Sequence, residues 1–416
     1  MNARERVLSA VAHKEPDRVP IDQGSMRSTG ITAIAYNLLK RHLGSGDSHT
    51  YLYDVVQQLA EPEPWYLDRF QVDVVDLGRA FASRDWREWT LPDGSRALAP
   101  AWFEATREDG GLTVRHSDGT IIGKMPAGAT GIDQTFWPLT APDALDCYEP
   151  LGEKMQYVTW GALPSSPWDE PLTPSRLEEI GTAARILYES TDRAISLSLG
   201  CSLLEWSQFL FGMEQAYLFM AGEKRRFARF LDSLTEMHLD FLDRVLPAVR
   251  GYVQILVFGD DLGTQRGPQI SRAMYRELFF PRHRKLYDCA RRLSGAHIFL
   301  HSCGGIFELI PDLIDAGVEI LNPVQTSARN MDPVRLKKEF GKDVTFWGGG
   351  CDTQKTLPYG TPQDVKDDVR RRLDIFMAGG GYVWNQIHNI MADVPPGNIE
   401  AMLEAAIEYG RYNVRT

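Results

Sequence analysis

The stretch Ile298–Leu321, IFLHSCGGIFELIPDLIDAGVEIL, contains one strand–helix–strand unit. Ile298–Leu300 and Glu319–Leu321 are short apolar runs typical of buried strands, and Pro311–Ala316 between them begins with a proline, which suits a first helical turn. A strand, a helix and a second strand in this order form a parallel pair with a right-handed crossover. The stretch therefore predicts an α/β protein built on a parallel sheet.

The same alternation extends along most of the chain. Eight short apolar or β-branched segments are predicted strands: Arg18–Asp22, Val72–Leu77, Ile195–Leu199, Val253–Phe258, Ile298–Leu300, Glu319–Leu321, Val344–Trp347 and Tyr382–Trp384. From the third strand onward, an amphipathic segment follows each strand. These predicted helices include Glu223–Val249, Ser271–Ser294, Pro311–Ala316, Pro333–Phe340 and Pro362–Met377. Eight such units favour a closed (β/α)8 TIM barrel over an open doubly wound sheet.

Residues 85–139 interrupt this alternation between the second and third predicted strands. Four strand-like segments occur there: Trp86–Thr90, Ala97–Ala101, Leu112–Arg115 and Thr120–Lys124. The turns between them contain Asp-Gly pairs, which favour tight hairpins. We expect a single barrel domain over residues 1–416, with 85–139 as a β-rich insertion. The insertion would cap the barrel mouth, make the contact of a homodimer, or lie at the periphery.

Composition and charge argue against several classes of function. Of the 416 residues, 43% are hydrophobic and 24% charged, which is enough apolar material for a large core. The formal net charge of −11 argues against a nucleic-acid or anionic-membrane surface. Because no apolar run is long enough to span a bilayer and no signal-peptide pattern occurs, we expect a cytoplasmic protein. The five scattered cysteines argue against a disulfide scaffold.

A histidine and a cysteine follow the strand Ile298–Leu300. Side chains two residues apart on a strand point the same way, so His301 and Cys303 would both face the barrel interior. This is the carboxyl end of the strand, where barrel enzymes build their sites. Imidazole and thiolate together suit zinc. Taken alone, the pair is equally consistent with a hydrogen-bonded core histidine beside an inert buried cysteine.

Two further side chains able to bind zinc follow later strands. Cys351 ends the glycine run after the seventh predicted strand, and His388 follows the eighth. A catalytic zinc has three protein ligands and one exchangeable position. We therefore predict a metal site that contains His301 and Cys303, with Cys351 or His388 as the third ligand. The alternatives are that Cys351 only packs in its glycine turn, and that His388 binds substrate or is structural.

Carboxylate and amide side chains also follow the predicted strands. Asp260 and Asp261 come after the fourth strand, and because adjacent residues alternate in direction, only one of them is expected to face the cavity. That carboxylate would accept a proton, hold a ligand histidine or bind a polar substrate group, and Asp22 is a third candidate for such a catalytic role. The expected substrate-binding residues are Gln23, Glu205, Asn322, Gln325 and Asn385, of which Glu205 is also a candidate oxygen ligand. No P-loop, dinucleotide fingerprint or G-x-S-x-G elbow occurs, so neither a nucleotide cofactor nor a serine hydrolase is indicated.

Taken together, these motifs resemble the uroporphyrinogen decarboxylase superfamily, in the branch related to cobalamin-dependent methyltransferases. The similar segments run nearly from end to end: Arg4–Arg6, Glu15–Pro20, Gly259–Gln265, His301–Gly304, Gly348–Gln354, Gly360–Pro362, and His388–Pro396 with Asn398. The decarboxylase proper has an arginine-rich M-R-Q-A-G-R segment that grips the carboxylates of a tetrapyrrole. The corresponding stretch here, Ile21–Gly30, has Arg27 as its only arginine, which argues against porphyrinogen decarboxylation.

The resemblance implies a zinc site and methyl transfer. In the methyltransferase branch, zinc is bound by H-x-C, here His301 and Cys303, and by a later cysteine after the last barrel strand, where this chain has His388. The chain lacks a D-x-H-x-x-G cobalamin-binding segment, so a separate protein would supply the corrinoid. The expected activity is methyl transfer between that corrinoid protein and a thiol or small methylated compound, with an O-demethylase acting on a methoxy compound as the leading case.

Two other functions remain open at this point. One is a metal-independent decarboxylase of a small or tetrapyrrole carboxylic acid, which would use Asp22 or Asp261 near the cavity. The other is a non-catalytic barrel that binds a ligand and whose histidine and cysteine side chains are structural.

Overall fold

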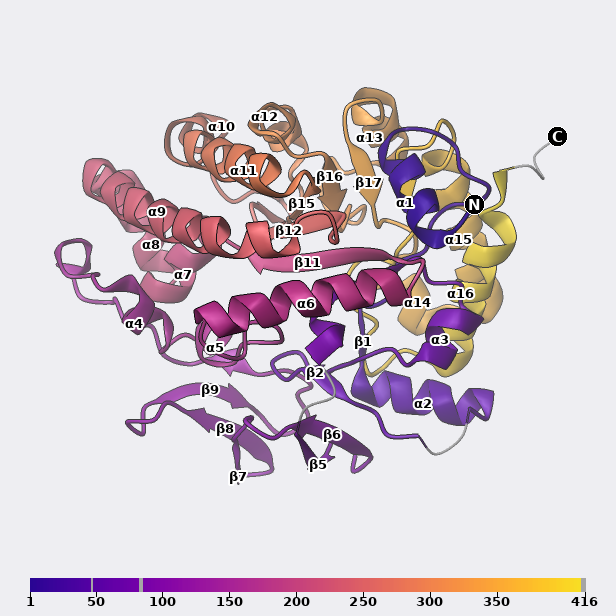
Figure 1. Ribbon diagram of the computed structural model, residues 1–416, viewed down its shortest axis with the longest axis horizontal. Coiled ribbons are helices and arrows are strands. Elements are labelled where there is room, and N and C mark those ends of the chain that lie inside the picture. Colours follow the sequence, from indigo (N-terminus) through magenta and orange to yellow (C-terminus); the bar gives the residue numbers. More distant parts are fainter. Residues whose placement is uncertain (46–47, 82–84, 413–416) are drawn as a thin grey trace.

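The computed structural model describes residues 1–45, 48–81 and 85–412. Its central element is a parallel sheet of seven strands in the order β18-β17-β16-β15-β12-β11-β4. In chain order these are β4 (Val74–Asp76), β11 (Ala194–Gly200), β12 (Ile255–Gly259), β15 (His297–His301), β16 (Ile320–Asn322), β17 (Thr345–Trp347) and β18 (Tyr382–Val383). Each strand pairs with the next parallel strand along the chain, and helices surround them (Figure 1). The seven later strands predicted from the sequence are all present.

The segment around Ile21 closes this sheet into a barrel. Ile21 forms a parallel bridge with Trp384: the Asp22 N–H donates to the Trp384 carbonyl (3.0 Å), and the Trp384 N–H donates to the Pro20 carbonyl (2.8 Å). On its other side, the Ile21 carbonyl accepts from the Asp73 N–H, next to β4, at 2.8 Å. Ile21 thus joins the two edge strands, and the predicted (β/α)8 TIM barrel is confirmed.

The first predicted strand, Arg18–Asp22, is shorter than expected. Only Ile21 within it forms a bridge to the barrel sheet. Pro20 has no N–H to donate, and the N–H of Ile21 donates to the Asp73 carboxylate (2.8 Å) instead of to a neighbouring strand. A ladder longer than one residue therefore does not form here.

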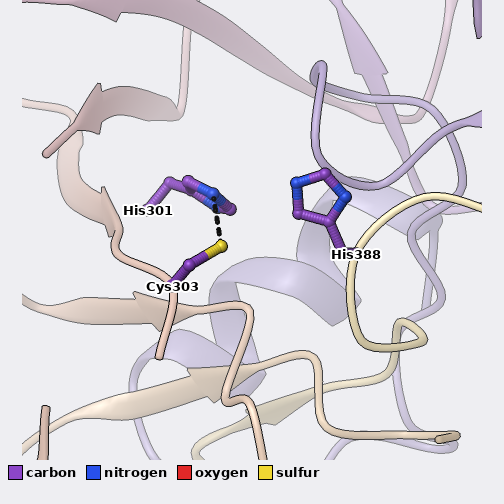
Figure 2. A group of neighbouring side chains, drawn as sticks. All are labelled: His301, Cys303 and His388. Atoms are coloured by element: carbon purple, nitrogen blue, oxygen red, sulfur yellow. Dashed lines mark hydrogen bonds between the residues drawn. The ribbon is translucent and has the colours of Figure 1, made fainter. Parts of the chain in front are cut away.

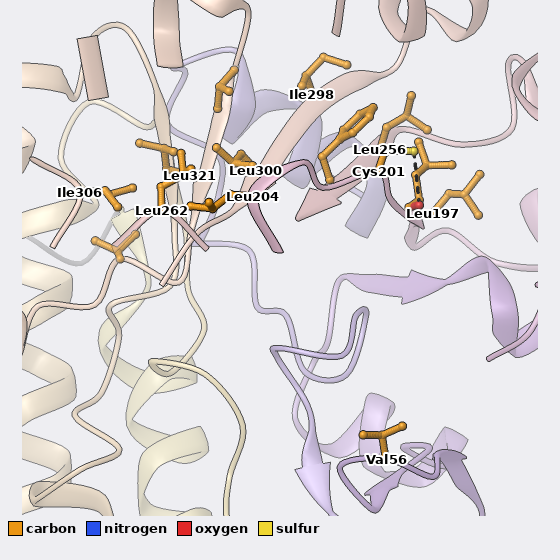
Figure 3. Packing of buried hydrophobic residues seen from close by; sticks show 14 of the residues in the cluster. Val56, Leu197, Cys201, Leu204, Leu256, Leu262, Ile298, Leu300, Ile306 and Leu321 are labelled. Carbon is orange, nitrogen blue, oxygen red and sulfur yellow. Dashed lines mark hydrogen bonds between the residues drawn. The ribbon is translucent and has the colours of Figure 1, made fainter. Parts of the chain in front are cut away.

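Both faces of the barrel strands are buried. Because side chains alternate between the two faces of a strand, they form two separate cores, one inside the barrel and one beneath the surrounding helices. Alternate strand residues are buried together inside the barrel: Val74, Ala194, Ile255, Val257, Phe299, Ile320, Trp347 and Val383. Their neighbours along the strands, such as Leu256, Ile298 and Leu300, belong to the larger cluster shown in Figure 3. Burial on both faces is expected of parallel strands covered by helices. The same alternation decides which polar residues at the strand ends point into the barrel.

Helices cover the outside of the barrel (Figure 1). The longer ones are α1 (Ala3–Val11), α2 (Ala33–Leu43), α6 (Pro174–Ser190), α7 (Leu204–Phe211), α8 (Met213–Gly222), α9 (Lys224–Val249), α11 (Phe280–Ser294), α12 (Ile310–Ala316), α13 (Pro333–Phe340), α15 (Pro362–Phe376) and α16 (Pro396–Tyr409). Shorter helices are α3 (Pro64–Arg69), α4 (Leu151–Met155), α5 (Thr159–Ala162), α10 (Arg272–Met274) and α14 (Thr356–Tyr359). Within the described residues, no helix combines the length and the apolar character needed to cross a membrane.

One predicted helix is interrupted. The sequence predicts a single helix over Ser271–Ser294, but α10 is followed by a π-helical turn at Tyr275–Phe279, and α11 begins only at Phe280. Pro281 occupies the first turn of α11, where its missing N–H leaves no helical bond broken. A regular helix through this proline would lose a hydrogen bond, so the chain starts a new one there.

Residues 86–134 form antiparallel sheets outside the barrel. A hairpin joins β5 (Trp86–Thr90) to β6 (Arg96–Pro100), and a four-stranded sheet has the order β10-β9-β8-β7, with β7 (Thr106–Glu108), β8 (Gly111–Arg115), β9 (Ile121–Met125) and β10 (Asp133–Gln134). Smaller sheets contain β1 (Ile31–Thr32), β2 (Leu52–Asp54) and β3 (Leu59–Ala60), and β13 (Gly263–Thr264) and β14 (Gly267–Pro268). The hairpins expected from the Asp-Gly turns are β5–β6 and β8–β9. The three- and two-residue strands β7 and β10 are too short to show a period in the sequence.

Candidate metal centre and cavity

A cavity of about 630 Å³ lies at the carboxyl ends of the barrel strands. Its wall includes Ser198–Cys201 at the end of β11, Val257–Gly259 of β12, His301 at the end of β15 and His388 after β18. Sites for small molecules have volumes of roughly 300–1,000 Å³. The position and size of this cavity make it the candidate active site.

Three side chains able to bind a metal meet at this cavity (Figure 2). One ligand atom from each of His301, Cys303 and His388 lies within 4.8 Å of the other two. The Cys303 Sγ is 3.4 Å from the His301 Nε2. Bonds of about 2.3 Å to sulfur and 2.0 Å to nitrogen place two ligands of a tetrahedral zinc roughly 3.5 Å apart. The donor types and the Cys303–His301 spacing therefore fit zinc.

Strand β15 and a tight turn position the first two of these side chains. His301 has the same parity as Phe299, which lies inside the barrel, so its ring also points inward. After Cys303 the chain turns at Gly304, whose φ of 86° is in the left-handed region. A Cβ on Gly304 would lie 2.4 Å from the Gly263 backbone, so this close approach requires glycine. The two glycines of HSCGG thus belong to the turn that presents the cysteine.

Asn322, at the end of β16, determines which nitrogen of His301 is free. Its Nδ2 donates to the Trp347 carbonyl at 2.9 Å, so the Oδ1 is the atom that faces His301. The His301 Nδ1–H donates to that oxygen at 2.6 Å, which leaves the Nε2 lone pair directed towards Cys303. A hydrogen bond of this kind holds a metal-binding histidine in one tautomer and orientation. Asn322, which the sequence suggested as a substrate-binding residue, therefore contacts the candidate ligand His301.

Replacing Asn322 by leucine is expected to weaken zinc binding roughly 10–100-fold, the usual cost of losing such a partner. Asn322→Asp keeps an oxygen for the His301 Nδ1–H but loses the donor to the Trp347 carbonyl, so it should recover part of the affinity. Competition with a chromophoric chelator measures the dissociation constant of each variant. Equal zinc affinity in the wild type and Asn322→Leu would contradict this role.

His388 faces the other two side chains from the loop after β18 (Figure 2). Its φ of 70° is a backbone conformation that residues other than glycine rarely adopt, and such conformations cluster at functional sites. The ring centroid lies 5.6 Å from that of His301. Burial, followed by the neighbouring His301, lowers the pKa of His388 to about 3, so the ring is neutral near pH 7. Neutral imidazole is the form that binds metals.

Cys351 lies in a different environment. It is fully buried, and burial followed by the nearby Asp368 raises the pKa of its thiol well above the usual value. Asp368 belongs to α15 on the outside of the barrel, as does Arg372, whose positive charge lowers the pKa of the same thiol. Asp368 also accepts a hydrogen bond from the Asp352 N–H at 2.9 Å. Among the described residues, the group of candidate metal ligands contains His388 and not Cys351.

The two carboxylates after β12 point in different directions. Asp261 has the parity of Ile255 and Val257 and lines the cavity. Its Oδ1 accepts the Cys303 N–H at 2.7 Å and lies 3.7 Å from the His301 Nε2. Asp261 therefore supports the loop that carries the candidate ligands.

Asp260 has the opposite parity and is fully buried beneath the N-terminus of α7. Its carboxylate accepts the backbone N–H groups of Leu203, Leu204 and Glu205 at 3.1, 3.1 and 2.9 Å. The His283 Nε2 lies 3.0 Å from the same carboxylate. A carboxylate that satisfies three free N–H groups at a helix start is an anchor for that helix. Asp260 is thus placed to hold α7 on the barrel.

Glu205, in the first turn of α7, also lines the cavity. Burial, followed by the charges of Asp261 and Asp260, raises its pKa well above the usual value. A Cβ at position 259 would lie 3.3 Å from the Glu205 Oε2, so Gly259 leaves room for this carboxyl group. A carboxyl group whose pKa is raised is suited to general acid catalysis.

The uroporphyrinogen decarboxylase (URO-D) family profile matches residues 168–409, which is more than half of the chain. The chain belongs to the URO-D family. The matched region contains all the strands from β11 to β18 and all three candidate metal ligands. The family resemblance of the sequence motifs is therefore confirmed.

Curated relatives and a solved structure extend this comparison. The uroporphyrinogen decarboxylase of Pseudomonas fluorescens is 26% identical over 204 residues, which cover 46% of this chain and 55% of that protein. The one from Chlorobium phaeobacteroides is 22% identical over 304 residues, covering 67% and 81%. The matches thus span from about half to four fifths of these relatives. A methyltransferase from Methanosarcina mazei has the same fold over 98% of this chain and 99% of its own, with a TM-score of 0.57 and 15% identity.

Asp22 lies behind the cavity wall of this URO-D family member. It is fully buried, and its carboxylate accepts the Trp347 Nε1–H at 2.8 Å and the Ser25 N–H at 3.1 Å. Burial raises its pKa to about 6. The described residues that line the cavity do not include Asp22. Its side chain instead contacts Trp347 and Ser25.

The other predicted substrate-binding residues also contact neighbouring loops. Gln23 donates to the Gln386 side chain at 2.5 Å, and Asn385 donates to the Asp22 carbonyl at 3.0 Å. The Gln325 Oε1 accepts the Gly304 N–H at 2.8 Å and so braces the turn after Cys303. Of the five side chains suggested for substrate binding, Glu205 alone is among the described residues of the cavity wall.

A group of aromatic side chains that the sequence did not single out forms much of the cavity wall. These are Trp160, Trp168, Trp206, Phe209, Phe241 and Phe258. They come from α5, from the segment before α6, from α7 and α9, and from β12. Apart from Trp206 and Phe209, which share α7, these residues come from separate segments of the chain, so no motif contains them and only the fold brings them together.

Asp76, at the end of β4, is a partly buried carboxylate that the sequence did not single out. Burial is the main reason why the pKa of Asp76 is raised to about 7. The negative charge of Glu61 also raises this pKa, whereas the hydrogen bond from the Gly78 N–H and the positive charges of Arg27 and Arg79 lower it. The folded protein therefore holds this proton over a range, about pH 4 to 7, in which the unfolded chain releases it. Through this group, stability falls as pH rises from about 4 to 7.

Asp76→Asn is expected to remove that part of the pH dependence. Relative to the wild type, the variant should gain up to roughly 1.4 kcal/mol of unfolding free energy for each pH unit between 5 and 7. Urea unfolding at pH 5, 6, 7 and 8 measures this difference, and Asp133→Asn on the exposed strand β10 is the control. A free-energy difference that does not change with pH would rule out the raised pKa.

Proposed function

We propose that this protein is a zinc-dependent methyltransferase that moves a methyl group between a small methylated compound and a corrinoid held by a separate protein. The observation that carries the proposal is the meeting of His301, Cys303 and His388 at the cavity. Three protein ligands leave one position for a substrate, as in catalytic zinc sites. The fold shared with a protein described as a methyltransferase supports the same class.

Zinc at this site would supply a Lewis acid that polarises the oxygen or sulfur atom bonded to the methyl group. The roles of the chain's own residues follow from their contacts. Asn322 holds His301 in the tautomer with a free Nε2, and Asp261 holds the Cys303 backbone. Glu205, whose pKa is raised, lines the same cavity and would give a proton to the group that loses its methyl. The corrinoid protein would dock over the barrel mouth.

Metal analysis combined with a methyl transfer assay tests this function. The purified protein is expected to contain about one zinc per chain. It should form methylcobalamin from cob(I)alamin when supplied with methoxyarenes, methanol, methylamines or methyl thioethers as a donor panel, followed by absorbance. A protein without metal that still transfers methyl groups would sink the zinc mechanism, and a zinc protein inactive on the whole panel would sink methyl transfer.

Decarboxylation is the second candidate, because the two relatives described above are named uroporphyrinogen decarboxylases. Its direct test is incubation of the protein with uroporphyrinogen under anaerobic conditions, followed by oxidation and separation of the porphyrin products. If decarboxylation is the activity, products with fewer carboxyl groups appear and do not depend on zinc. If methyl transfer is the activity, the uroporphyrinogen is recovered unchanged.

A further inference from the structure

Asp76, at the end of β4, points into the barrel. It has the same parity as Val74, whose side chain is buried inside the barrel, and it pairs in register with Ser196 of β11. Its Oδ1 accepts the Gly78 N–H at 2.6 Å, and no described residue donates a hydrogen bond to its other oxygen. That oxygen is therefore available to a proton or to a water molecule.

A small pocket of about 60 Å³ lies beside Asp76, between the barrel and the β5–β6 hairpin. Its wall includes side chains from β2, from β4 and the turn after it, and from the hairpin: Tyr53, Asp76, Arg79, Trp86 and Pro100. A bridge between Tyr51 and Leu98 attaches the hairpin to the chain at β2 (Figure 1). Because Asp85 and Trp102 at the same wall are exposed, the pocket is open to solvent.

A third space, of about 10 Å³, lies between this outer pocket and the main cavity. Tyr53, Asp76 and Ser166 line both this space and the outer pocket. Arg27 and Ser198 line both this space and the main cavity. Roughly 10–15 Å³ is the room that one water molecule needs. A water-sized space thus separates the outer pocket from the candidate active site.

The groups around this space suit a water molecule. The Tyr53 hydroxyl oxygen is buried and has no hydrogen-bond partner among the described residues. The free oxygen of Asp76 and the side chain of Ser198, which has the inward parity of Ala194, line the same space. A buried water typically makes two to four hydrogen bonds to polar groups of this kind. A water here would give the Tyr53 hydroxyl the partner that the protein does not supply.

The charges around Asp76 let it exchange a proton near neutral pH. Burial raises the pKa of Asp76 to about 7, and Glu61 also raises it, whereas the Gly78 N–H, Arg27 and Arg79 lower it. A group transfers protons best when its pKa lies near the working pH, because it then both accepts and releases them. The other described ionisable side chains of the outer pocket and the water-sized space are Tyr53, Asp85 and Asp169.

The proposed methyl transfer consumes one proton in the cavity. The bond between the methyl carbon and its oxygen or sulfur atom breaks, and the methyl group passes to the cobalt(I) corrinoid without the bonding electrons. The electron pair stays on the oxygen or sulfur atom, which takes up one proton. Because the corrinoid must approach the methyl group through the barrel mouth, it covers the wide entrance while this proton is needed.

We propose that Tyr53 and Asp76, together with the water-sized space, form a side passage that returns protons to the cavity while the mouth is covered. The proposal rests on the proposed methyl transfer. Each time Glu205 gives a proton to the product, Asp76 takes one from the solvent and passes it through a water molecule to the cavity. One proton enters for each methyl group transferred, so atoms and charge balance.

Infrared spectroscopy tests the passage without any turnover. Between pH 5 and 9 the zinc-loaded protein should lose a carboxylic acid C=O band that is absent from Asp76→Asn, with a midpoint near the pKa of about 7. On transfer to D2O at pH 5, the band should shift within the mixing time, because the outer pocket connects Asp76 to the solvent. The absence of such a band, or a band that does not exchange, overturns the passage.

Tyr53→Phe separates the passage from a structural role. The hydroxyl that it removes has no partner among the described residues, so urea unfolding should show unchanged or slightly higher stability. Repeated methyl transfer to excess cob(I)alamin should nevertheless slow at least threefold, while the first turnover, which uses a proton bound before mixing, stays unchanged. Tyr51→Phe, at a tyrosine outside all three spaces, should change neither quantity. Wild-type repeated turnover in Tyr53→Phe overturns the passage.

Asp76→Asn and Asp76→Ala test the proton carrier itself. Repeated turnover should slow at least tenfold in both, again without loss of the first turnover. In Asp76→Ala, the deleted carboxyl group leaves room in the outer pocket for imidazole, which titrates close to neutral pH. Added imidazole should recover at least threefold in rate in this variant and have no effect on the wild type. Unchanged rates in Asp76→Asn, or a loss in Asp76→Ala that imidazole does not relieve, overturns the role of Asp76.

The two proposals fail in different ways. If no donor supports methyl transfer, the proposed function is contradicted, and the infrared band still decides whether Asp76 exchanges its proton with the solvent. If methyl transfer occurs and repeated turnover is the same in Tyr53→Phe, Asp76→Asn and the wild type, the passage is contradicted and the proposed function stands.

Discussion

Replacing Cys303 by alanine is expected to reduce the zinc content from about one per chain to less than a tenth, and to lower methyl transfer more than a hundredfold. The thiolate would supply the negative charge of the ligand set, and its Sγ is 3.4 Å from the His301 Nε2. Loss of a direct ligand costs more than the 10–100-fold that follows loss of a residue behind the ligands. Elemental analysis after dialysis, together with the cob(I)alamin assay, measures both effects.

The same measurement on His388→Ala and Cys351→Ala decides which residue is the third ligand. We expect zinc to be lost from His388→Ala and retained in Cys351→Ala, because among the described residues His388, and not Cys351, belongs to the group whose ligand atoms lie within 4.8 Å of one another. Circular dichroism shows whether each variant is folded, and Cys289→Ala, on the outer helix α11, is a neutral control. Zinc lost from Cys351→Ala but kept by His388→Ala would contradict the arrangement.

The barrel was predictable because its strands follow a local rule. Each of the seven strands of the sheet is a short apolar run, and from β11 onward a helical segment follows each strand, so that even three residues such as Ile320–Asn322 stand out in the sequence. The closing strand was overestimated because Pro20 and the Asp73 carboxylate limit it to the bridge at Ile21. That restriction depends on a contact between residues 52 positions apart, which no local pattern reveals.

The candidate site was predictable only where strand geometry determines it. The period of two placed His301 and Cys303 on the inner side, and it separated Asp260 from Asp261. The choice between Cys351 and His388 depends on the direction in which two loops leave their strands. One loop turns towards Asp368 of α15 and the other towards His301, and these are tertiary contacts.

The cavity wall was the least predictable part of the site. Trp160 and Trp168 lie in the connection before α6, a segment without strand or motif character, and Trp206 reads in the sequence as an apolar helix position. Their common role comes from the packing of this connection over the barrel mouth. The sequence suggests only polar side chains for substrate binding, whereas the wall is mostly apolar.

Asp260→Ala and Asp261→Ala, two neighbouring substitutions of the same kind, are expected to affect different properties: the first mainly stability, the second mainly zinc binding. Loss of the buried Asp260 carboxylate leaves the N–H groups of residues 203–205 and the His283 ring without their acceptor. The expected cost is about 3–5 kcal/mol of unfolding free energy. Asp261→Ala removes a single acceptor, that of the Cys303 N–H, and should cost only about 1 kcal/mol.

For activity and zinc binding, Asp261→Ala should be the more damaging of the two substitutions. Asp261→Ala is expected to weaken zinc binding roughly tenfold, because the carboxylate holds the loop that carries Cys303. Asp260→Ala leaves that loop intact and, at a temperature where it is folded, should retain zinc. Urea unfolding and chelator competition measure the two quantities on the same samples.

Asp260→Asn separates the charge of the anchor from its shape. The amide keeps one oxygen for the N–H groups at the start of α7 but no longer offers two charged acceptors, so its stability should lie between those of Asp260→Ala and the wild type. Because Glu205 lies in the first turn of α7, any loosening of this anchor also moves a carboxyl group at the cavity. The methyl transfer rate of Asp260→Asn should therefore fall while its zinc content does not. If zinc and rate fell together, Asp260 would act on the metal ligands directly, and the division of roles between the two carboxylates would be wrong.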